Sequence, residues 1–250
     1  MTSMKADNLE IRIFDNRQQM GLSAAQTISA CIRKKLKKQN SVRIIFAAAP
    51  SQNEVLRELF SDTEIDFGRI EAFHMDEYVG LPESDPHTFH AFLDQYFSRV
   101  KMKRVFYIDE IKEKDRVCTS YTEKLFEKPV DIVILGIGEN GHLAFNDPEV
   151  AAFQDPEAMK IVRLDEVCRM QQVHDGCFAS MDKVPTHAYT LTLPSLMRPE
   201  YKFCIVPNVE KAEAVCKVVN GPVTESCPAS ILRTASNAML FLDQAAASKL

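Results

Sequence analysis

The sequence contains no apolar run of the roughly 18 residues that a membrane-spanning helix needs. Its first seven residues also lack the apolar core of a secretory signal peptide. The seven cysteines are an odd number without any C-x-x-C pair, which argues against both a disulfide framework and a zinc site. These absences predict a cytoplasmic protein that does not contact membranes.

The sequence also has fewer positive than negative charges. It contains 30 Lys and Arg residues and 35 Asp and Glu residues, which gives a formal net charge of −5. A general nucleic-acid binder needs clustered Lys and Arg for the phosphates, so nucleic acid is not an expected partner. The rest of the composition, 46% hydrophobic and 26% charged over 250 residues, is that of an ordinary globular protein. Since the sequence shows no linker or repeat, we expect one domain over 1–250, with residues 1–7 disordered.

Predicted strands alternate with predicted helices along the whole chain. The strands are expected at 8–14, 42–48, 69–75, 104–108, 131–135, 160–164, 186–193, 203–206 and 238–242. The helices are expected to begin at Asp15, Pro50, Asp85, Asp115, Asp165 and Asn208. Such alternation predicts the α/β class: a doubly wound, mostly parallel, Rossmann-like sheet with helices on both faces.

The stretch after the apolar run 131–135 is the most informative of the sequence. Gly136, Gly138 and Gly141 form a flexible turn, directly followed by His142 and then by Asp147. The glycine spacing matches the G-x-G-x-x-G dinucleotide fingerprint, but Pro148 ends any helix that would have to follow it. A nucleotide cofactor is therefore not expected. The pattern instead places an imidazole and a carboxylate at the carboxyl end of a central strand, where open α/β sheets bind ligands.

Other strand ends carry further polar candidates. The strand 69–75 leads to Asp76 and Glu77, although adjacent acids at such positions are more often solvated. The helix that starts at Pro50 could offer N–H groups to an anion, and Lys211 lies in a first helical turn, where a cation is disfavoured unless it meets an anionic ligand. No third ligand joins His87 and His90, so no metal is expected. This set suits proton transfer on a small phosphorylated metabolite, by an isomerase or by a hydrolase, and does not decide between them.

Two longer motifs resemble the signatures of the glucosamine-6-phosphate deaminases. They are Phe-His-Met-Asp-Glu-Tyr-Val-Gly-Leu-Pro, which ends at Pro82, and Gly-Ile-Gly-Glu-Asn-Gly-His-Leu-Ala-Phe-Asn-Asp-Pro, which ends at Pro148. Segments beginning at Val184, Glu210 and Pro228 continue the resemblance in the same order. The related 6-phosphogluconolactonases share the Gly-His pair but typically have Asp-Glu-Arg where this chain has Asp-Glu-Tyr. The deaminase branch is therefore the more similar one.

The resemblance implies a catalytic role for four residues. Asp76 would move the proton between C2 and C1 of the open-chain sugar, and His142 would open the ring. Asn140 would orient His142, and Asp147 would complete the relay. The products would be a ketose 6-phosphate and ammonia, without a cofactor.

The resemblance also implies which residues hold the substrate. Lys211 would pair with the 6-phosphate. The loop at 48–52 would help with N–H groups, and an arginine, for which Arg169 is the candidate, would join them. The substrate-binding set is then Ala48, Ala49, Ser51, Gln52, Glu77, Gly138, Arg169 and Lys211.

This chain departs from the family pattern at three places. Asn140 stands where the family usually has aspartate, and Asp147 where it has glutamate, which predicts a carboxylate set back by about 1.5 Å. Ala48-Ala49-Pro50-Ser51 replaces a Thr-Gly-Gly-Thr phosphate loop, and Pro50 removes one N–H donor. Two alternatives to the deaminase therefore stay open. One is a lactonase acting on a sugar-acid phosphate, and the other is a sugar-phosphate sensor without catalysis. The expected assembly is a monomer or a small homo-oligomer.

Overall fold

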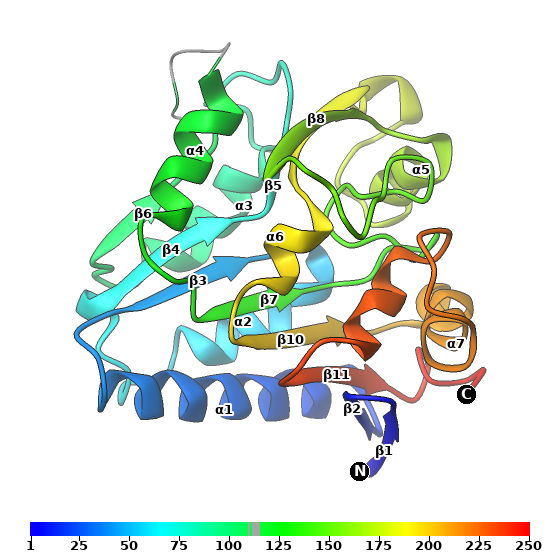
Figure 1. Cartoon of the computed structure of the whole chain (residues 1–250), viewed down its shortest axis with the longest axis horizontal. Helices are drawn as coiled ribbons and strands as arrows, with labels where there is room; N and C mark the ends of the chain where they lie inside the picture. The colour runs from blue at the N-terminus through cyan, green and yellow to red at the C-terminus, as the bar shows by residue number, and fades with distance from the viewer. Residues whose placement is uncertain (110, 112–115) are drawn as a thin grey trace.

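The computed structural model describes residues 1–109, 111 and 116–250, and it contains two sheets surrounded by helices (Figure 1). In this part of the chain no helix is long and apolar enough to cross a membrane. The strands are β1 (Thr2–Ala6), β2 (Leu9–Phe14), β3 (Val42–Phe46), β4 (Ile70–His74), β5 (Asp76–Tyr78), β6 (Arg104–Phe106), β7 (Ile132–Leu135), β8 (Met159–Arg163), β9 (His187–Leu191), β10 (Tyr201–Val206) and β11 (Ala238–Asp243). The α-helices are α1 (Arg17–Leu36), α2 (Asn53–Leu59), α3 (Phe89–Phe97), α4 (Val117–Phe126), α5 (Glu166–His174), α6 (Leu193–Met197) and α7 (Ala212–Asn220), with short 3₁₀ turns at Pro50–Gln52, Phe67–Arg69, Met181–Lys183, Val209–Lys211 and Pro228–Arg233.

The main sheet has eight strands in the order β1-β2-β11-β10-β7-β3-β4-β6. Every neighbouring pair in it is parallel except β1 and β2, so the predicted α/β class with a mostly parallel sheet is confirmed. The expectation that residues 1–7 are disordered is wrong. Thr2 to Ala6 pair antiparallel with β2 and form the edge strand, although their side chains are mostly exposed. Exposure on both faces explains why no apolar pattern predicted this strand.

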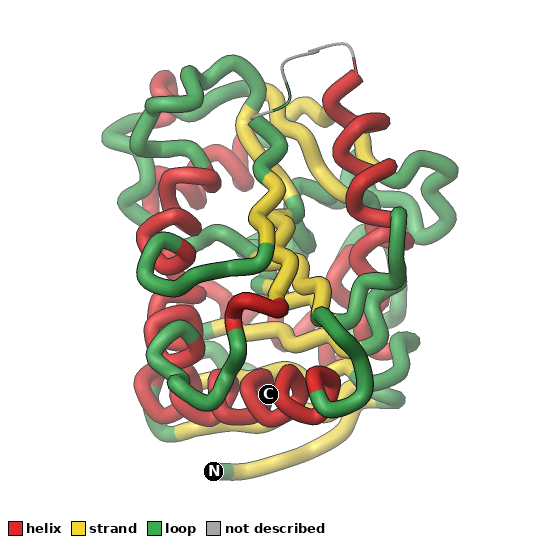
Figure 2. Tube along the Cα trace, turned by 90° about the vertical axis from the view of Figure 1, so that its left-hand side faces the viewer, coloured by secondary structure: helices red, strands yellow, loops and turns green. Residues whose placement is uncertain are grey.

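Helices cover both faces of the main sheet, as the continuous burial of the central strands requires (Figure 2). Ile132 and Ile134 of β7 face one core, which α1, α2 and α3 close. Val133 and Leu135 face the other core, which α4, α6 and α7 close. Because both faces are buried, the strand reads as an unbroken apolar run rather than as an alternation.

A second, antiparallel sheet in the order β5-β9-β8 lies beyond the carboxyl ends of the main strands. The segments 160–164 and 186–193 belong to this sheet and not to the main one. The prediction that all the strands form one doubly wound sheet is therefore wrong for these two segments. Their alternating pattern fits two strands with one solvated face, which is typical of antiparallel pairs. This sheet also holds Asp76 in place, since Asp76 pairs with Thr190.

Two predicted helix starts differ from the structure by a few residues. The side chain of Asn16, not Asp15, caps α1 by accepting from the N–H of Gln19 at 2.9 Å. Thr88 caps α3, which therefore begins after Asp85 and Pro86 rather than at them. The predicted start at Asp115 lies outside the described residues. Asp165 caps α5 as predicted.

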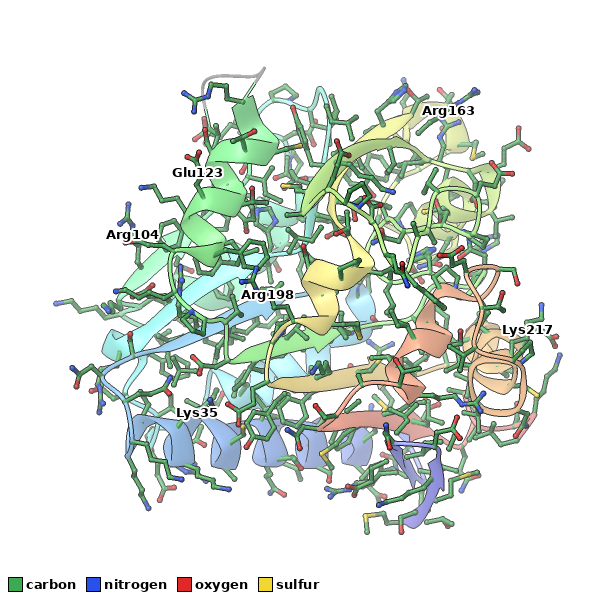
Figure 3. The ribbon with its side chains drawn as sticks, in the orientation of Figure 1. Lys35, Arg104, Glu123, Arg163, Arg198 and Lys217 are labelled. Atoms are coloured by element: carbon green, nitrogen blue, oxygen red, sulfur yellow. The ribbon has the colours of Figure 1, made fainter. Side chains whose placement is uncertain are left out.

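The parallel strands β3, β4, β7 and β10 all end on the same side of the molecule, where α5 and α7 lie (Figure 1). The opposite side of the sheet is closed by charge pairs. Lys35 near the end of α1 binds Asp131 at the start of β7, with an N–O distance of 2.9 Å (Figure 3). The polar residues at the carboxyl ends are therefore the ones that remain available to a ligand.

Candidate active site

A cleft that is open to solvent lies at the carboxyl ends of the main strands. Seven of the predicted site residues line it, from segments far apart in the sequence: Ala48, Ala49, Ser51, Asp76, Gly138, His142 and Lys211.

His142 is oriented from behind by two oxygen atoms. Its ring Nδ1 lies 2.8 Å from Oδ1 of Asn140 and 2.9 Å from Oδ1 of Asp147. Because both neighbours of Nδ1 are acceptors, Nδ1 carries a proton, and Nε2 is left for a ligand in the cleft. The ring is thus held in one tautomer by residues that the sequence places two positions before it and five after it.

Asp147 reaches His142 although its side chain is one methylene shorter than a glutamate. The expected set-back of its carboxylate is not observed, since the backbone brings Oδ1 within 2.9 Å of the ring. Burial raises the pKa of this carboxyl, but the bonds and charge of His142 and the amide of Asn140 outweigh burial, and the net shift is downward. Asp147 is therefore an anion suited to stabilise an imidazolium.

Gly138 makes room for the imidazole rather than donating to a substrate. Its N–H donates to the carbonyl of His142 at 3.0 Å, and the N–H of Gly141 donates to the carbonyl of Gly138 at 2.9 Å. The N–H groups of Gly138 and Gly141 are therefore used within the turn and are not available to a substrate. A Cβ on Gly138 would lie 2.1 Å from Cε1 of His142, so only glycine allows the ring to sit against the turn.

We expect Gly138→Ala to lower turnover by about 100-fold or more, because the added methyl must push the imidazole out of its position. The fold should survive, since the turn itself needs no positive φ at this residue. The measurement is kcat together with the thermal midpoint. Gly80→Ala, at an exposed turn with no atom near the added Cβ, is the control for a backbone effect alone. Unchanged kcat in the Gly138 variant would contradict this role.

Asp76 is buried at the floor of the cleft, and no side chain or backbone donor among the described residues bonds to its carboxylate. Burial, assisted by the charge of Glu77, raises the pKa of Asp76 well above its ordinary value. β3 lies between β4 and β7, so the strands that lead to Asp76 and His142 are not neighbours. Both side chains nevertheless face one cleft. A carboxylate with a raised pKa is a suitable general base.

Lys211 supplies the positive charge of the cleft. The residue is buried, and its Nζ has no hydrogen-bond partner in the described part of the chain. Burial lowers the pKa of its ammonium group, and the nearby carboxylates of Asp175 and Glu139 offset this only in part. A buried ammonium without a partner is costly unless a ligand pairs with it, so its position points to an anionic ligand.

The loop that follows β3 offers few donors. The N–H of Gln52 donates to the carbonyl of Ala49 at 2.8 Å and is not available to a ligand. The Gln52 side chain bonds Ser51 Oγ at 3.0 Å and the carbonyl of Ile205 at 3.2 Å, so it supports Ser51 instead of lining the cleft. The N–H groups of Ala48, Ala49 and Ser51 and the hydroxyl of Ser51 remain as the donors of this segment.

Two predicted substrate residues lie elsewhere. The guanidinium of Arg169 donates to the carbonyls of Met181 and Val184 at 2.7 and 2.9 Å, so it holds a loop and is not a phosphate ligand. Glu77 accepts backbone N–H groups at the start of α3, and its carboxylate does not line the cleft. Burial raises the pKa of Glu77 to about 7, although the hydrogen bonds from the backbone act to lower it.

Sequence reasoning missed the contribution of α5. Gln171, Gln172 and Asp175 line the cleft from this helix. Gln171 accepts from the N–H of Glu139 at 2.9 Å and donates to Asp175 at 3.2 Å, which connects α5 to the glycine turn. A polar residue facing a cleft and one facing solvent look alike in a helical pattern, so the sequence carried no signal for these three.

Among residues 1–109, 111 and 116–250, two groups of side chains have spacings that a metal ion would accept: His142, Asp147 and Cys168, and His74, Glu77 and Asp109. In the first, Nδ1 of His142 donates to oxygen atoms and has no lone pair for a metal. In the second, Nε2 of His74 accepts from the N–H of Ile108 at 2.8 Å, which leaves the proton on Nδ1. Both imidazoles are arranged for hydrogen bonding, and neither group fits a metal without rearrangement.

Comparison with known proteins relates the chain to a group of sugar-phosphate enzymes. The family described as glucosamine-6-phosphate isomerases/6-phosphogluconolactonase matches residues 15–241. A glucosamine-6-phosphate deaminase of Listeria monocytogenes is 33% identical over 211 residues, which cover 84% of this chain and 88% of that protein. One from Lacticaseibacillus paracasei is 30% identical over 244 residues, which cover 97% and 99%.

Solved structures show the same relationship. A monomeric glucosamine-6-phosphate deaminase superposes with a TM-score of 0.86 at 26% identity, covering 99% of this chain and 100% of its own. A 6-phosphogluconolactonase from Thermotoga maritima superposes with a TM-score of 0.75 at 18% identity, covering 94% and 99%, which shows the shared fold.

Proposed function

The chain belongs to the family of glucosamine-6-phosphate isomerases and 6-phosphogluconolactonases, and from this premise we propose that it converts glucosamine 6-phosphate, or a close epimer, to a ketose 6-phosphate and ammonia. The observation that carries the proposal is the meeting of Asp76, His142 and Lys211 in one cleft. A base, an acid and an anion ligand are the parts that an aldose–ketose isomerisation of a sugar phosphate needs.

The chemistry begins with ring opening. A protonated His142 gives a proton from Nε2 to the ring oxygen while the anomeric hydroxyl gives its proton to water in the open cleft, and Asp147 stabilises the imidazolium. Asp76 then removes the proton from C2 of the open-chain aldose and returns it to C1. In the same step the C1 oxygen gains a proton and the amine loses one, so that C1 carries a hydroxyl group and C2 an imine. Water adds to the resulting C2 imine, and ammonia leaves as the ketose forms.

Tyr78 and the named relatives favour the deaminase over the lactonase alternative, because the lactonases typically have arginine in place of this tyrosine but share the aspartate two positions before it. Hydrolysis of a lactone requires activation of water and stabilisation of an oxyanion, and no carbon-bound proton moves. A buried carboxylate with a raised pKa and no partner among the described residues is suited to taking a proton from carbon. The curated relatives with 30–33% identity also carry the deaminase name.

The test is to incubate the purified protein with glucosamine 6-phosphate and to assay ammonia and fructose 6-phosphate together. We expect the two products in equal amounts. Hydrolysis of 6-phosphogluconolactone without ammonia release would support the lactonase instead. Tight binding of the amino-sugar phosphate without any product would support a sensor.

We also infer that the protein works in the cytoplasm as a monomer or a small homo-oligomer and needs no cofactor. The seven cysteines are all free, which suits a reducing compartment. The deaminase with the TM-score of 0.86 is described as monomeric. Light scattering during size-exclusion chromatography measures the assembly directly.

A further inference from the structure

The amide of Asn140 uses all of its hydrogen-bonding capacity. Its Nδ2 donates to Oδ1 of Asp147 and to Oδ2 of Asp165, both at 3.0 Å. Its Oδ1 accepts from the backbone N–H of His142 at 3.1 Å and lies 2.8 Å from Nδ1 of the same residue. The two carboxylates fix the orientation of the amide, because a flipped amide would place its oxygen against both of them.

Asp165 divides its two carboxylate oxygens between different tasks. Oδ1 accepts from the N–H of Cys168 and caps α5, whereas Oδ2 accepts from Asn140. Capping alone would require only one oxygen, and serine or threonine would serve as well. The second oxygen points away from the helix toward the network behind His142.

We propose that Asp165 is a positioning residue, which holds the Asn140 amide so that its oxygen faces Nδ1 of His142. Without this second carboxylate, Asp147 and the backbone N–H of His142 are the remaining restraints on the amide, and a rotated amide would present its N–H₂ group to the N–H of the imidazole. Two donors facing each other repel, so the imidazole would lose its fixed tautomer and orientation. The proposal rests on the proposed function for its kinetic effect, but its structural effect does not depend on turnover.

The same geometry makes position 140 and position 165 depend on each other. An aspartate at 140 would bring a third carboxylate into contact with Asp147 and Asp165, and like charges at such distances cannot all be ionised without a large penalty. Removal of the Asp165 carboxylate should relieve this conflict. The two substitutions are therefore expected to be strongly non-additive.

The central variant is Asp165→Ser, which keeps a capping oxygen and removes the one that binds Asn140. We expect kcat to fall about tenfold or more with a smaller change in KM. In nitrogen-15 NMR spectra of the imidazole, the signal of the Nδ1-protonated tautomer should weaken or broaden. Asn16→Ser exchanges the cap of α1, a helix that contributes no residue to the cleft lining, and controls for helix capping with kcat within about twofold of the wild type. Asp165→Asn, which keeps the shape but turns a donor toward Asn140, is the second variant if the serine variant is poorly folded.

The pair test uses Asn140→Asp with and without Asp165→Ser. We expect Asn140→Asp alone to have a lower kcat than the double variant. The double variant should recover at least part of the lost kcat and of the NMR signal. An unchanged imidazole spectrum in both Asp165 variants, or a double variant no better than Asn140→Asp alone, would overturn the proposal. Because the NMR signal needs no substrate, a wrong assignment of the reaction would leave this test intact.

Discussion

Replacing Asp76 by asparagine is expected to lower kcat by about 10²–10⁴-fold, the usual effect of removing a general base. The amide is nearly the same size and cannot accept the proton from C2. KM should change little, since the phosphate and the ring contacts remain. The measurement is steady-state kinetics with ammonia detection, and Asp182→Asn, at a carboxylate that is 73% exposed, is the matched control.

The same substitution should make the protein more stable. The pKa of Asp76 is raised by burial above 3.8, so the native state holds this proton more tightly than the unfolded state does. The wild type therefore loses stability as the pH rises from 3.8 through the native pKa, whereas Asp76→Asn does not. The gain of the variant in free energy of unfolding should grow with pH across that window. Equal stability of both proteins at every pH would show that the carboxyl is not desolvated.

Replacing Lys211 by methionine is expected to weaken binding of sugar phosphates by at least about 2 kcal/mol, or roughly thirtyfold in KM. Loss of one member of a buried charge pair leaves the phosphate without its partner. In the absence of ligand the variant should be more stable than the wild type at neutral pH, because burial lowers the pKa of the lysine and so opposes its charged form in the native state.

The measurement is thermal unfolding in increasing concentrations of inorganic phosphate, followed by KM for the sugar phosphate. Phosphate should raise the midpoint of the wild type and not that of the variant. Lys217→Met on α7, at a side chain that is 63% exposed, provides the control (Figure 3). A variant that responds to phosphate as the wild type does would place the anion elsewhere.

The sequence predicted the central strands well because both their faces are buried. Runs such as Val42–Phe46 and Ile132–Leu135 have no polar residue pointing out of the sheet except Arg43, and strands of this kind carry a strong local signal. The second sheet was missed because three-residue β5 is defined by its partner β9, more than a hundred residues away. Pairing partners of this kind are a property of the tertiary fold, and no local pattern encodes them.

In the candidate site, too, the positions at strand ends could be predicted from the sequence and the contacts between distant side chains could not. Asp76, His142 and Lys211 follow strands or open a helical turn, and the sheet brings such positions together in one cleft. Arg169 was a wrong choice because residue type does not reveal that its guanidinium bonds the carbonyls of its own loop. Asp165 was predicted only as a helix cap, and its contact with Asn140 depends on how α5 packs against the glycine turn.

The proposed reaction requires one hexose that is bound between Asp76 and His142 with its phosphate at Lys211. A crystal structure with 2-amino-2-deoxyglucitol 6-phosphate, the open-chain alcohol related to the substrate, tests this directly. We expect the phosphate within hydrogen-bond distance of Nζ of Lys211, C2 facing the Asp76 carboxylate, and the oxygen of C5 near Nε2 of His142. A ligand bound outside this cleft, or bound with C2 turned away from Asp76, would contradict the proposed proton transfer.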